Sequence, residues 1–340
     1  MALPPTAVSR NSSLASPYLK INESIAMAEI LETGDDIVRV RQSTLIGLNR
    51  DASSIPLISN SIKAHKAGGF LSAFRGRGME FHESRLYQPG DDIRSIDWRV
   101  TARSGSTHTK VYQEERERPV LLWVDLQQSM FFGTRVCFKS VLAAKLAALL
   151  AWSSVQHGDR LGGLIFSEQD HFELRPRRGK AAVLHFIQQL VEHKAWHRDK
   201  AGVDSNTGLQ ALNRLRQVTR PGSLVVLISD FRFLNESCRN HLAQLSRHND
   251  VVLLFTHDPL EQALPPSGYY RLTDGESEIA FDSADSGSRE QYQQRYQRHY
   301  QALEQLCNQL QLFLIDVSTA DDMLETLQSA LGLRKHHRRQ

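Results

Sequence analysis

The stretch Val120-Leu-Leu-Trp-Val-Asp125-Leu-Gln-Gln-Ser129 decides the fold of this 340-residue chain. It opens with an unbroken apolar run, Val120 to Val124, which fits a strand that is buried on both faces, as in a parallel sheet. The run ends in an acid, Asp125, and a polar turn comes next. Ligands of open α/β sheets bind beyond the carboxyl ends of the strands, so Asp125 and Ser129 mark a candidate site.

The chain beyond this stretch alternates between helical and strand patterns. The Leu- and Ala-rich residues 136–155 predict a helix, and the apolar runs 224–230 and 250–257 predict two more buried strands. Further strands are expected at 160–167, 171–175 and 312–317, and further helices at 180–193, 207–218, 237–247, 288–310 and 321–331. Such alternation predicts an α/β fold with a doubly wound, mostly parallel sheet, preceded by a helical and charged-loop N-terminal region.

Changes in composition divide the chain into four expected parts. Residues 1–20, rich in Ser, Pro and Ala, are expected to be disordered. Residues 21–118 hold two expected helices, at 21–33 and 36–49, and then a charged segment. Residues 119–332 form the α/β domain, and 333–340 a basic tail.

The composition excludes several classes of protein. A hydrophobic fraction of 41% suits a soluble globular chain, and a net charge of +3 is too small to predict nucleic-acid binding. The three cysteines are scattered and fit neither a disulfide framework nor a zinc site. The most apolar stretch, 141–152, is interrupted by Lys145 and is too short to span a membrane, and the N-terminus lacks the pattern of a signal peptide. We therefore expect a cytoplasmic protein without a membrane span.

Four oxygen-bearing side chains are predicted to meet at one edge of the sheet: Asp125, Ser129, Thr207 and Asp230. Carboxylate and hydroxyl oxygens are hard ligands that suit magnesium or manganese. The structural alternative is that such an acid only caps a turn or a helix. Lys139, in the next predicted helix, either faces these acids or extends its ammonium to water.

This set of four resembles the metal-ion-dependent adhesion site of the von Willebrand factor A domain. That family uses Asp-x-Ser-x-Ser after the first strand, then a Thr, and then an Asp in a Ser-Asp-Gly-like turn. Ser229-Asp230 matches, but Gln127 stands where the pattern has its middle serine. The resemblance implies a cation, Mg or Mn, whose open position accepts a partner's carboxylate; Gln127 implies a reshaped site, or one in which cation binding is weak or lost.

The charged segment before the α/β domain carries the most specific pattern, with aromatic residues placed between charges of both signs. Pro89-Gly90 fits a turn, Asp91 or Asp92 can cap a second short turn after it, and Ile93, Ile96 and Trp98 are expected as apolar anchors. The residues of this segment expected to form a structural motif or a docking face are Arg75, Gly76, Gly78, Glu80, Phe81, Arg85, Tyr87, Pro89, Gly90, Asp91, Asp92, Arg94, Asp97, Trp98 and Arg103.

Four interpretations of this segment compete. A nuclease-like carboxylate cluster lacks a Lys or His base at a suitable spacing, and a phosphate loop lacks both the preceding strand and a Gly-Lys-Ser/Thr sequence. A structural brace packed on the sheet is the leading interpretation, and a face for docking a partner is the alternative.

The same segment, with the strand that ends at Asp125, closely resembles the bacterial family of unknown function numbered 58 (DUF 58) over roughly residues 35–260. The resemblance implies a von Willebrand A-like domain after the charged segment. It also implies a gene beside that of a MoxR-type AAA+ ATPase, which is the inferred partner. It supplies no reaction.

We therefore expect a non-enzymatic adaptor that works with such an ATPase, or with its client protein, in protein assembly or maturation. Ser129 lacks the Gly-x-Ser-x-Gly elbow of a nucleophile. The alternatives are a metal-dependent hydrolase that uses the same acids, and a scaffold with a dead metal site.

Overall fold

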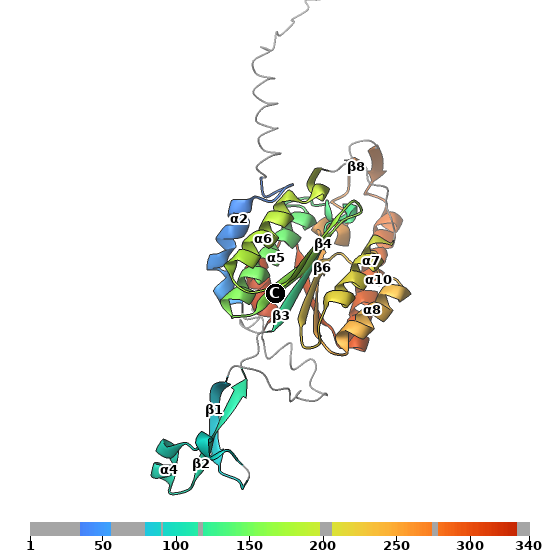
Figure 1. Ribbon diagram of the computed structural model, residues 1–340. Coiled ribbons are helices and arrows are strands. Elements are labelled where there is room, and N and C mark those ends of the chain that lie inside the picture. Colours follow the sequence, from blue (N-terminus) through green and yellow to red (C-terminus); the bar gives the residue numbers. More distant parts are fainter. Residues whose placement is uncertain are drawn as a thin grey trace, which may run out of the picture.

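The computed structural model describes residues 35–55, 79–89, 91–114, 118–197, 206–273 and 278–331. The segment expected to be disordered, 1–20, the helix expected at 21–33 and the basic tail, 333–340, lie outside these residues. Figure 1 shows the described elements as a layered α/β domain with a separate arm.

A six-stranded sheet forms the middle layer of the domain, and five of its strands are parallel. In spatial order the strands are β10 (Phe313–Ser318), β7 (Asp250–His257), β6 (Leu224–Ser229), β3 (Pro119–Asp125), β4 (Arg160–Phe166) and β5 (His171–Arg177). Only the edge strand β5 is antiparallel. The expected α/β fold class, a doubly wound and mostly parallel sheet, is confirmed by this strand order.

Helices cover both faces of the sheet, and strand β3 shows why the chain folds in this way. Val120, Leu122 and Val124 belong to one hydrophobic core, while Leu121 and Trp123 belong to the other. The first core is covered by α2 (Gln42–Gly47), α5 (Lys139–Gln156), α6 (Lys180–Glu192) and α11 (Met323–Ala330), and the second by α7 (Thr207–Val218), α8 (Glu236–Ser246) and α10 (Ser286–Leu310). Because side chains alternate between the faces of a strand, a continuous apolar run supplies both cores.

The first described helix belongs to the α/β domain. Val40 and Leu45 are fully buried in the first core, against α5. The helix was expected to start at Asp36, but α2 begins at Gln42. Asp36 has a positive φ of 65° and accepts hydrogen bonds from the Arg41 N–H and the Thr44 hydroxyl, so it forms a turn before the helix. A short helical extension follows α2, made of η1 (Leu48–Arg50) and η2 (Ala52–Ser54).

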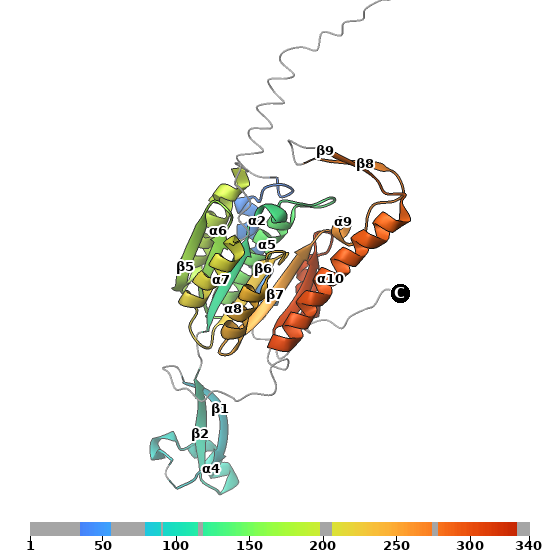
Figure 2. The same ribbon diagram turned by 90° about the vertical axis from the view of Figure 1, so that its right-hand side faces the viewer.

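The charged segment forms an arm rather than a loop. Its strands β1 (Met79–Leu86) and β2 (His108–Glu114) pair in antiparallel fashion, with η3 (Ile93–Ser95) and α4 (Trp98–Ser104) between them. The Asp92 side chain caps η3, as expected, by accepting a hydrogen bond from the Arg94 N–H. The arm lies apart from the layered domain (Figures 1 and 2). This differs from the brace packed on the sheet that the sequence predicted.

A second hairpin, β8 (Tyr269–Thr273) with β9 (Glu278–Asp282), lies between β7 and α10 in the sequence, and Figure 2 shows it beyond the end of α10. The short helix α9 (Pro259–Gln262) follows β7 directly. Among the described residues, no helix is both long enough and apolar enough to cross a bilayer. All three cysteines are buried and unpaired.

Candidate functional site

The predicted site lies where the order of the strands reverses, at the carboxyl ends of β3 and β6. Val124 pairs with Ile228, so Asp125 and Ser229 follow side by side. Asp125 is fully buried. The Ser229 hydroxyl donates to Asp125 Oδ2 at 2.6 Å, and the Gln127 N–H donates to Asp125 Oδ1 at 2.8 Å. Both carboxyl oxygens of Asp125 are therefore engaged by groups of the protein itself.

The second acid, Asp230, binds a buried lysine. Lys139 has a fully buried side chain, and its ammonium lies 2.7 Å from Asp230 Oδ2 and 2.8 Å from Glu261 Oε1. Of the two alternatives drawn from the sequence, Lys139 thus faces the acids. It is also the first residue of α5, where the helix dipole disfavours a cation. Its burial at that position depends on the two carboxylates.

A partly exposed arginine completes the network. The Arg232 guanidinium forms an ion pair with Glu261, and its Nε lies 3.4 Å from Asp230 Oδ2. Glu261 also accepts a hydrogen bond from the Asp258 N–H at 2.9 Å, through its other oxygen. The cluster of Lys139, Arg232, Asp230 and Glu261, called the lysine network below, balances two cations with two carboxylates.

The pKa values of the two acids of the site are shifted in opposite directions. Burial, together with the nearby charge of Asp230, raises the pKa of Asp125 to about 8, although the bond from Ser229 favours its charged form. Burial would also raise the pKa of Asp230, but the Lys139 ammonium and Arg232 together outweigh it and hold that pKa below its ordinary value. At neutral pH the edge therefore carries a charged Asp230 beside a protonated Asp125.

A strained turn holds Asp230 in place. The next residue, Phe231, has a φ of 54° and is fully buried. A bulky residue at positive φ is uncommon and needs support from its surroundings. The Ser229 hydroxyl supplies some of it by accepting a hydrogen bond from the Phe231 N–H at 2.9 Å. The turn between β6 and α8 is thus tied back to Asp125 through Ser229.

The two predicted hydroxyl ligands do not join the acids. Ser129 lies in η4 (Gln128–Met130), where the Gln128 N–H donates to Glu168. Thr207 is the first residue of α7, and its neighbour Gly208 packs against the Phe233 ring. Within the described residues, neither Ser129 nor Thr207 is hydrogen-bonded to Asp125 or Asp230.

The expected cation, Mg or Mn, does not fit this arrangement. Asp230 and Glu261 are already neutralised by Lys139 and Arg232, and the oxygens of Asp125 accept bonds from Ser229 and Gln127. In the part of the chain that the structure describes, no three Asp, Glu, His or Cys side chains gather into a group that could hold a metal. A divalent cation would need the oxygens that these internal donors use.

Two residues of the network, Glu261 and Arg232, were not predicted from the sequence. Glu261 is the third residue of α9, and it forms a capping box with Asp258 at the start of that helix. The signal was present as Asp258-Pro-Leu-Glu261, an N-cap followed by a proline and, three residues on, a glutamate, directly after a buried strand. It would have placed a third acid at the same edge of the sheet.

The arm residues divide into a bonded set and an exposed set. Arg85 forms an ion pair with Asp91 at 2.7 Å. Asp97 caps α4 and accepts a hydrogen bond from the Ser84 hydroxyl at 2.9 Å, which lowers the pKa of Asp97. Tyr87 lies near the Asp91 carbonyl, and Pro89 lies in the turn after it. Arg75, Gly76, Gly78 and Gly90 lie outside the described residues, as do the side chains of Glu80 and Phe81.

The prediction that apolar residues anchor the arm was wrong for two of them. Trp98 and Ile93 were expected to pack inward, but they are 69% and 67% exposed, and Leu86 on the same arm is 60% exposed. The reason is that the two-stranded arm has no layer of its own to cover these side chains. Arg94, Arg99 and Arg103 are exposed on the same arm.

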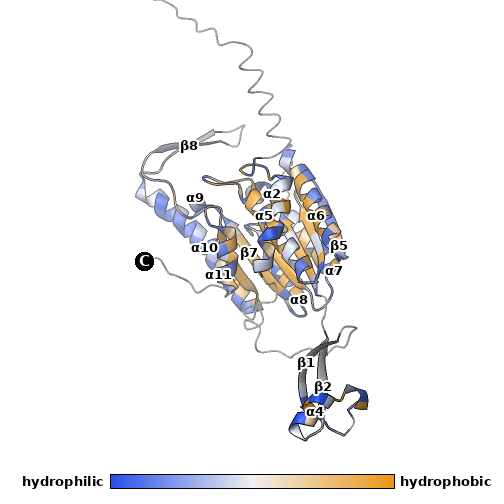
Figure 3. Cartoon of the chain, turned by 90° about the vertical axis from the view of Figure 1, so that its left-hand side faces the viewer, coloured by the Kyte–Doolittle hydropathy of each residue, from blue (hydrophilic) through white to orange (hydrophobic). Residues whose placement is uncertain are grey.

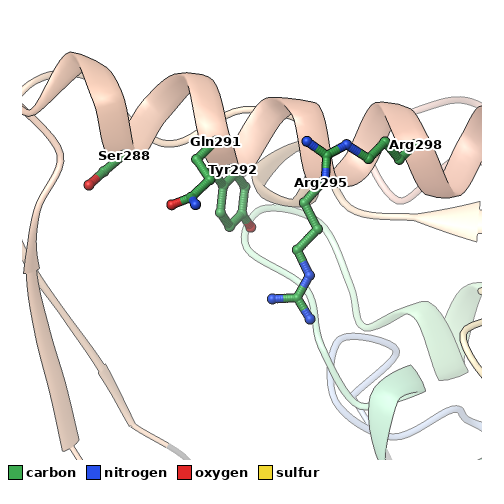
Figure 4. A pocket seen from close by; sticks show the side chains of 5 residues that line it. All are labelled: Ser288, Gln291, Tyr292, Arg295 and Arg298. Atoms are coloured by element: carbon green, nitrogen blue, oxygen red, sulfur yellow. The ribbon is translucent and has the colours of Figure 1, made fainter.

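A hollow on α10 borders this site, because the hydroxyl of Tyr292, which lines the hollow, donates to the carbonyl of Leu260, the neighbour of Glu261. Its lining residues are Ser288, Gln291, Tyr292, Arg295 and Arg298, all on one helix (Figure 4). A ligand site normally gathers groups from several elements around an apolar cavity. The α10 hollow therefore offers a polar surface of one helix and no converging set.

One protein family matches most of the described chain. The family described as "Protein of unknown function DUF58" matches residues 83–302, which agrees with the expected resemblance and extends further toward the C-terminus. The uncharacterized protein Rv1480 of Mycobacterium tuberculosis (strain H37Rv) and the uncharacterized protein Mb1516 of Mycobacterium bovis are each 35% identical over 212 residues. These matches cover 62% of this chain and 65% of each relative.

Solved structures are also similar to the chain. BatB from Bacteroides thetaiotaomicron matches with a TM-score of 0.40 and 15% identity, over 64% of this chain and 98% of that one. An aerotolerance-related membrane protein from Bacteroides fragilis matches with a TM-score of 0.36 and 15% identity, over 64% of this chain and all of the other. Neither similarity assigns an activity to this chain.

Proposed function

Since this chain belongs to the DUF58 family, we propose that it is a non-enzymatic adaptor that works with a MoxR-type AAA+ ATPase, or with its client, in protein assembly or maturation. The observation that carries the proposal is the exposed apolar surface on the arm, made of Leu86, Ile93 and Trp98. The partner class comes from the family resemblance.

The apolar side chains of the arm are costly to leave in water. Three large ones lie within 13 residues of sequence on a small two-stranded element, and Figure 3 shows apolar positions there among hydrophilic ones. Large exposed apolar side chains concentrated on one small element are typical of interaction sites on soluble proteins. Burial of Trp98 against a partner would remove the largest of these side chains from water.

Charge on the arm indicates the chemistry of the partner. Arg94, Arg99 and Arg103 are exposed close to Trp98 in the sequence, whereas Asp97 is buried and bonded. Tryptophan and arginine are the residue types that most often dominate binding energy at interfaces. We therefore expect the partner surface to present an apolar pocket ringed by carboxylates.

The hydrolase alternative receives less support from the site. A general base needs a free basic atom, and a metal needs open carboxylates. Asp230 and Glu261 hold Lys139, while Asp125 is bonded to Ser229 and Gln127. Turnover of a phosphoester or peptide panel by the purified protein, lost in Asp125→Ala, would contradict the non-enzymatic proposal.

The adaptor proposal is tested by co-purification from a host that expresses the ATPase. The tagged wild-type chain should recover the MoxR-type ATPase, and Trp98→Ala should lower the recovery by about tenfold or more, the loss typical of a central interface residue. Tyr269→Ala is the matched control, because Tyr269 is an aromatic residue with 71% exposure on another hairpin. If the tagged protein is repeatedly recovered alone while the ATPase is present, the proposal fails.

A further inference from the structure

The Lys139 ammonium binds Asp230, one of the four side chains that the von Willebrand A resemblance assigns to a divalent cation. We propose that Lys139 is a built-in cation, which fixes the carboxyl edge of the sheet without a metal and makes this edge insensitive to divalent ions. The proposal goes beyond the adaptor function and does not depend on it.

The position of Lys139 is the first support for this role. Its ammonium bridges acids that follow two adjacent parallel strands, Asp230 after β6 and Glu261 after β7. A divalent ion in such a site bridges oxygens from different strands in the same way. Lys139 itself begins α5, the helix that follows β3, so the bridge links segments that follow three neighbouring strands.

The charge of the network is the second support. Lys139 and Arg232 together supply two positive charges, the same charge as one Mg²⁺ or Mn²⁺ ion, to Asp230 and Glu261. A metal added to this network would lie beside two cations and without a free carboxylate. A like charge in a buried site is strongly unfavourable, so the network excludes the ion it replaces.

Burial of the network is the third support. The Lys139 side chain is fully buried, and those of Asp230 and Glu261 are 3% and 8% exposed. Removal of one partner from a buried ion pair leaves an uncompensated charge, which costs far more than the loss of a surface pair. The built-in cation is therefore expected to be essential for stability, whereas divalent ions are not.

The experiment measures melting temperature and metal binding for the wild type, for Lys139→Ala and for a control. The wild type should show the same melting temperature in EDTA, in 10 mM MgCl₂ and in 10 mM MnCl₂ at matched ionic strength, and no saturable heat on titration with either ion (about 10 mM exceeds the dissociation constants of most protein sites). Lys139→Ala should melt about 10 °C lower, and MnCl₂ should restore part of the loss because the carboxylates are left unpaired.

Lys145→Ala is the matched control. Lys145 lies on the same helix, partly buried, and its ammonium contacts only the Asp36 carbonyl, at 3.4 Å, among its hydrogen bonds in the described residues. It should lose less stability and gain no response to manganese. An equal response of the wild type and Lys139→Ala to manganese, including none in either, overturns the proposal.

The wild-type titration decides the question even if Lys139→Ala does not fold. Saturable binding of Mg²⁺ or Mn²⁺ by the wild type, lost in Asp230→Asn, would mean that the site holds a metal and that Lys139 does not replace it. Absence of such binding, together with loss of folding in Lys139→Ala but not in Lys145→Ala, supports the built-in cation.

Discussion

The regions at the two ends of strand β3 differ in which kind of side chain they bury and which they expose. At the carboxyl end, the charged residues of the lysine network are buried and paired with one another. The arm precedes the amino end, and there large apolar side chains such as Trp98 are exposed. About 20 Å of strand lies between these ends. The buried charges are paired within the domain, whereas the exposed apolar side chains of the arm are the observation on which the adaptor proposal rests.

Two tryptophans give the largest expected contrast between the domain and the arm. Trp152 is 3% exposed in the first core, and its indole donates to the Leu45 carbonyl at 3.0 Å, whereas Trp98 is 69% exposed. Trp152→Ala should cost about 3–5 kcal/mol of unfolding free energy, and Trp98→Ala should stay within about 0.5 kcal/mol. Urea denaturation of the two variants measures both values. Comparable losses would mean that Trp98 packs inside the protein, and the contrast between the ends of β3 would disappear.

A second prediction concerns the pH dependence of Asp125. Its pKa is raised from 3.8 to about 8 in the folded protein, so the folded state holds the proton more tightly than the unfolded chain. The stabilisation is complete below about pH 4 and is lost as pH rises toward 8, with a limiting slope of about 1.4 kcal/mol per pH unit. Asp125→Asn keeps a neutral side chain and should abolish this loss.

The measurement for Asp125→Asn is denaturation at several pH values between 5 and 8. The stability of the variant relative to the wild type should increase with pH. Asp230→Asn is the control of opposite sign and is measured at about pH 4 and below: the folded-state pKa of Asp230 is lowered, so its stabilisation is present above about pH 3.8 and is lost only as pH falls below that value. Parallel pH profiles for the wild type and Asp125→Asn would show that Asp125 is ionised when buried.

The sequence predicted the strands and helices correctly where a single hydrophobic pattern ran through the segment. The continuous apolar runs predicted β7 to the residue and β3 to within one residue, and the helical spacing of leucines predicted α7 to the residue. The same runs placed Asp125 and Asp230 together, because parallel strands end at one edge of the sheet. Periodicity could not show that the arm is a hairpin, since the alternation of apolar and polar residues in β1 covers only its first four residues.

Pairing was the part of the site that the sequence could not specify. Lys139 and Glu261 are 122 residues apart, and only the packing of α5 and α9 at the edge of the sheet brings their side chains together. The pattern of residue types predicted the acids as metal ligands, because such a pattern does not show that another element supplies the cation, here the Lys139 ammonium. The exposure of Trp98 was also not predicted, since its burial depends on whether another part of the fold packs over it.

The smallest expected effect is that of Asp97→Ala, which tests whether the arm and the domain unfold independently. Asp97 caps α4 through the Arg99 and Val100 N–H groups and also holds the Ser84 hydroxyl on β1. Asp97→Ala should loosen α4 and β1 locally and increase protease cleavage within the arm several-fold, since the loss of a helix cap shifts a local equilibrium by about that factor. The melting temperature of the α/β domain should not change. Arg103→Ala, on the same helix without a capping role, is the control and should leave cleavage unaltered. A domain that melts earlier in Asp97→Ala would mean that the arm and the sheet unfold as one unit, so the opposite ends of β3 would not be independent.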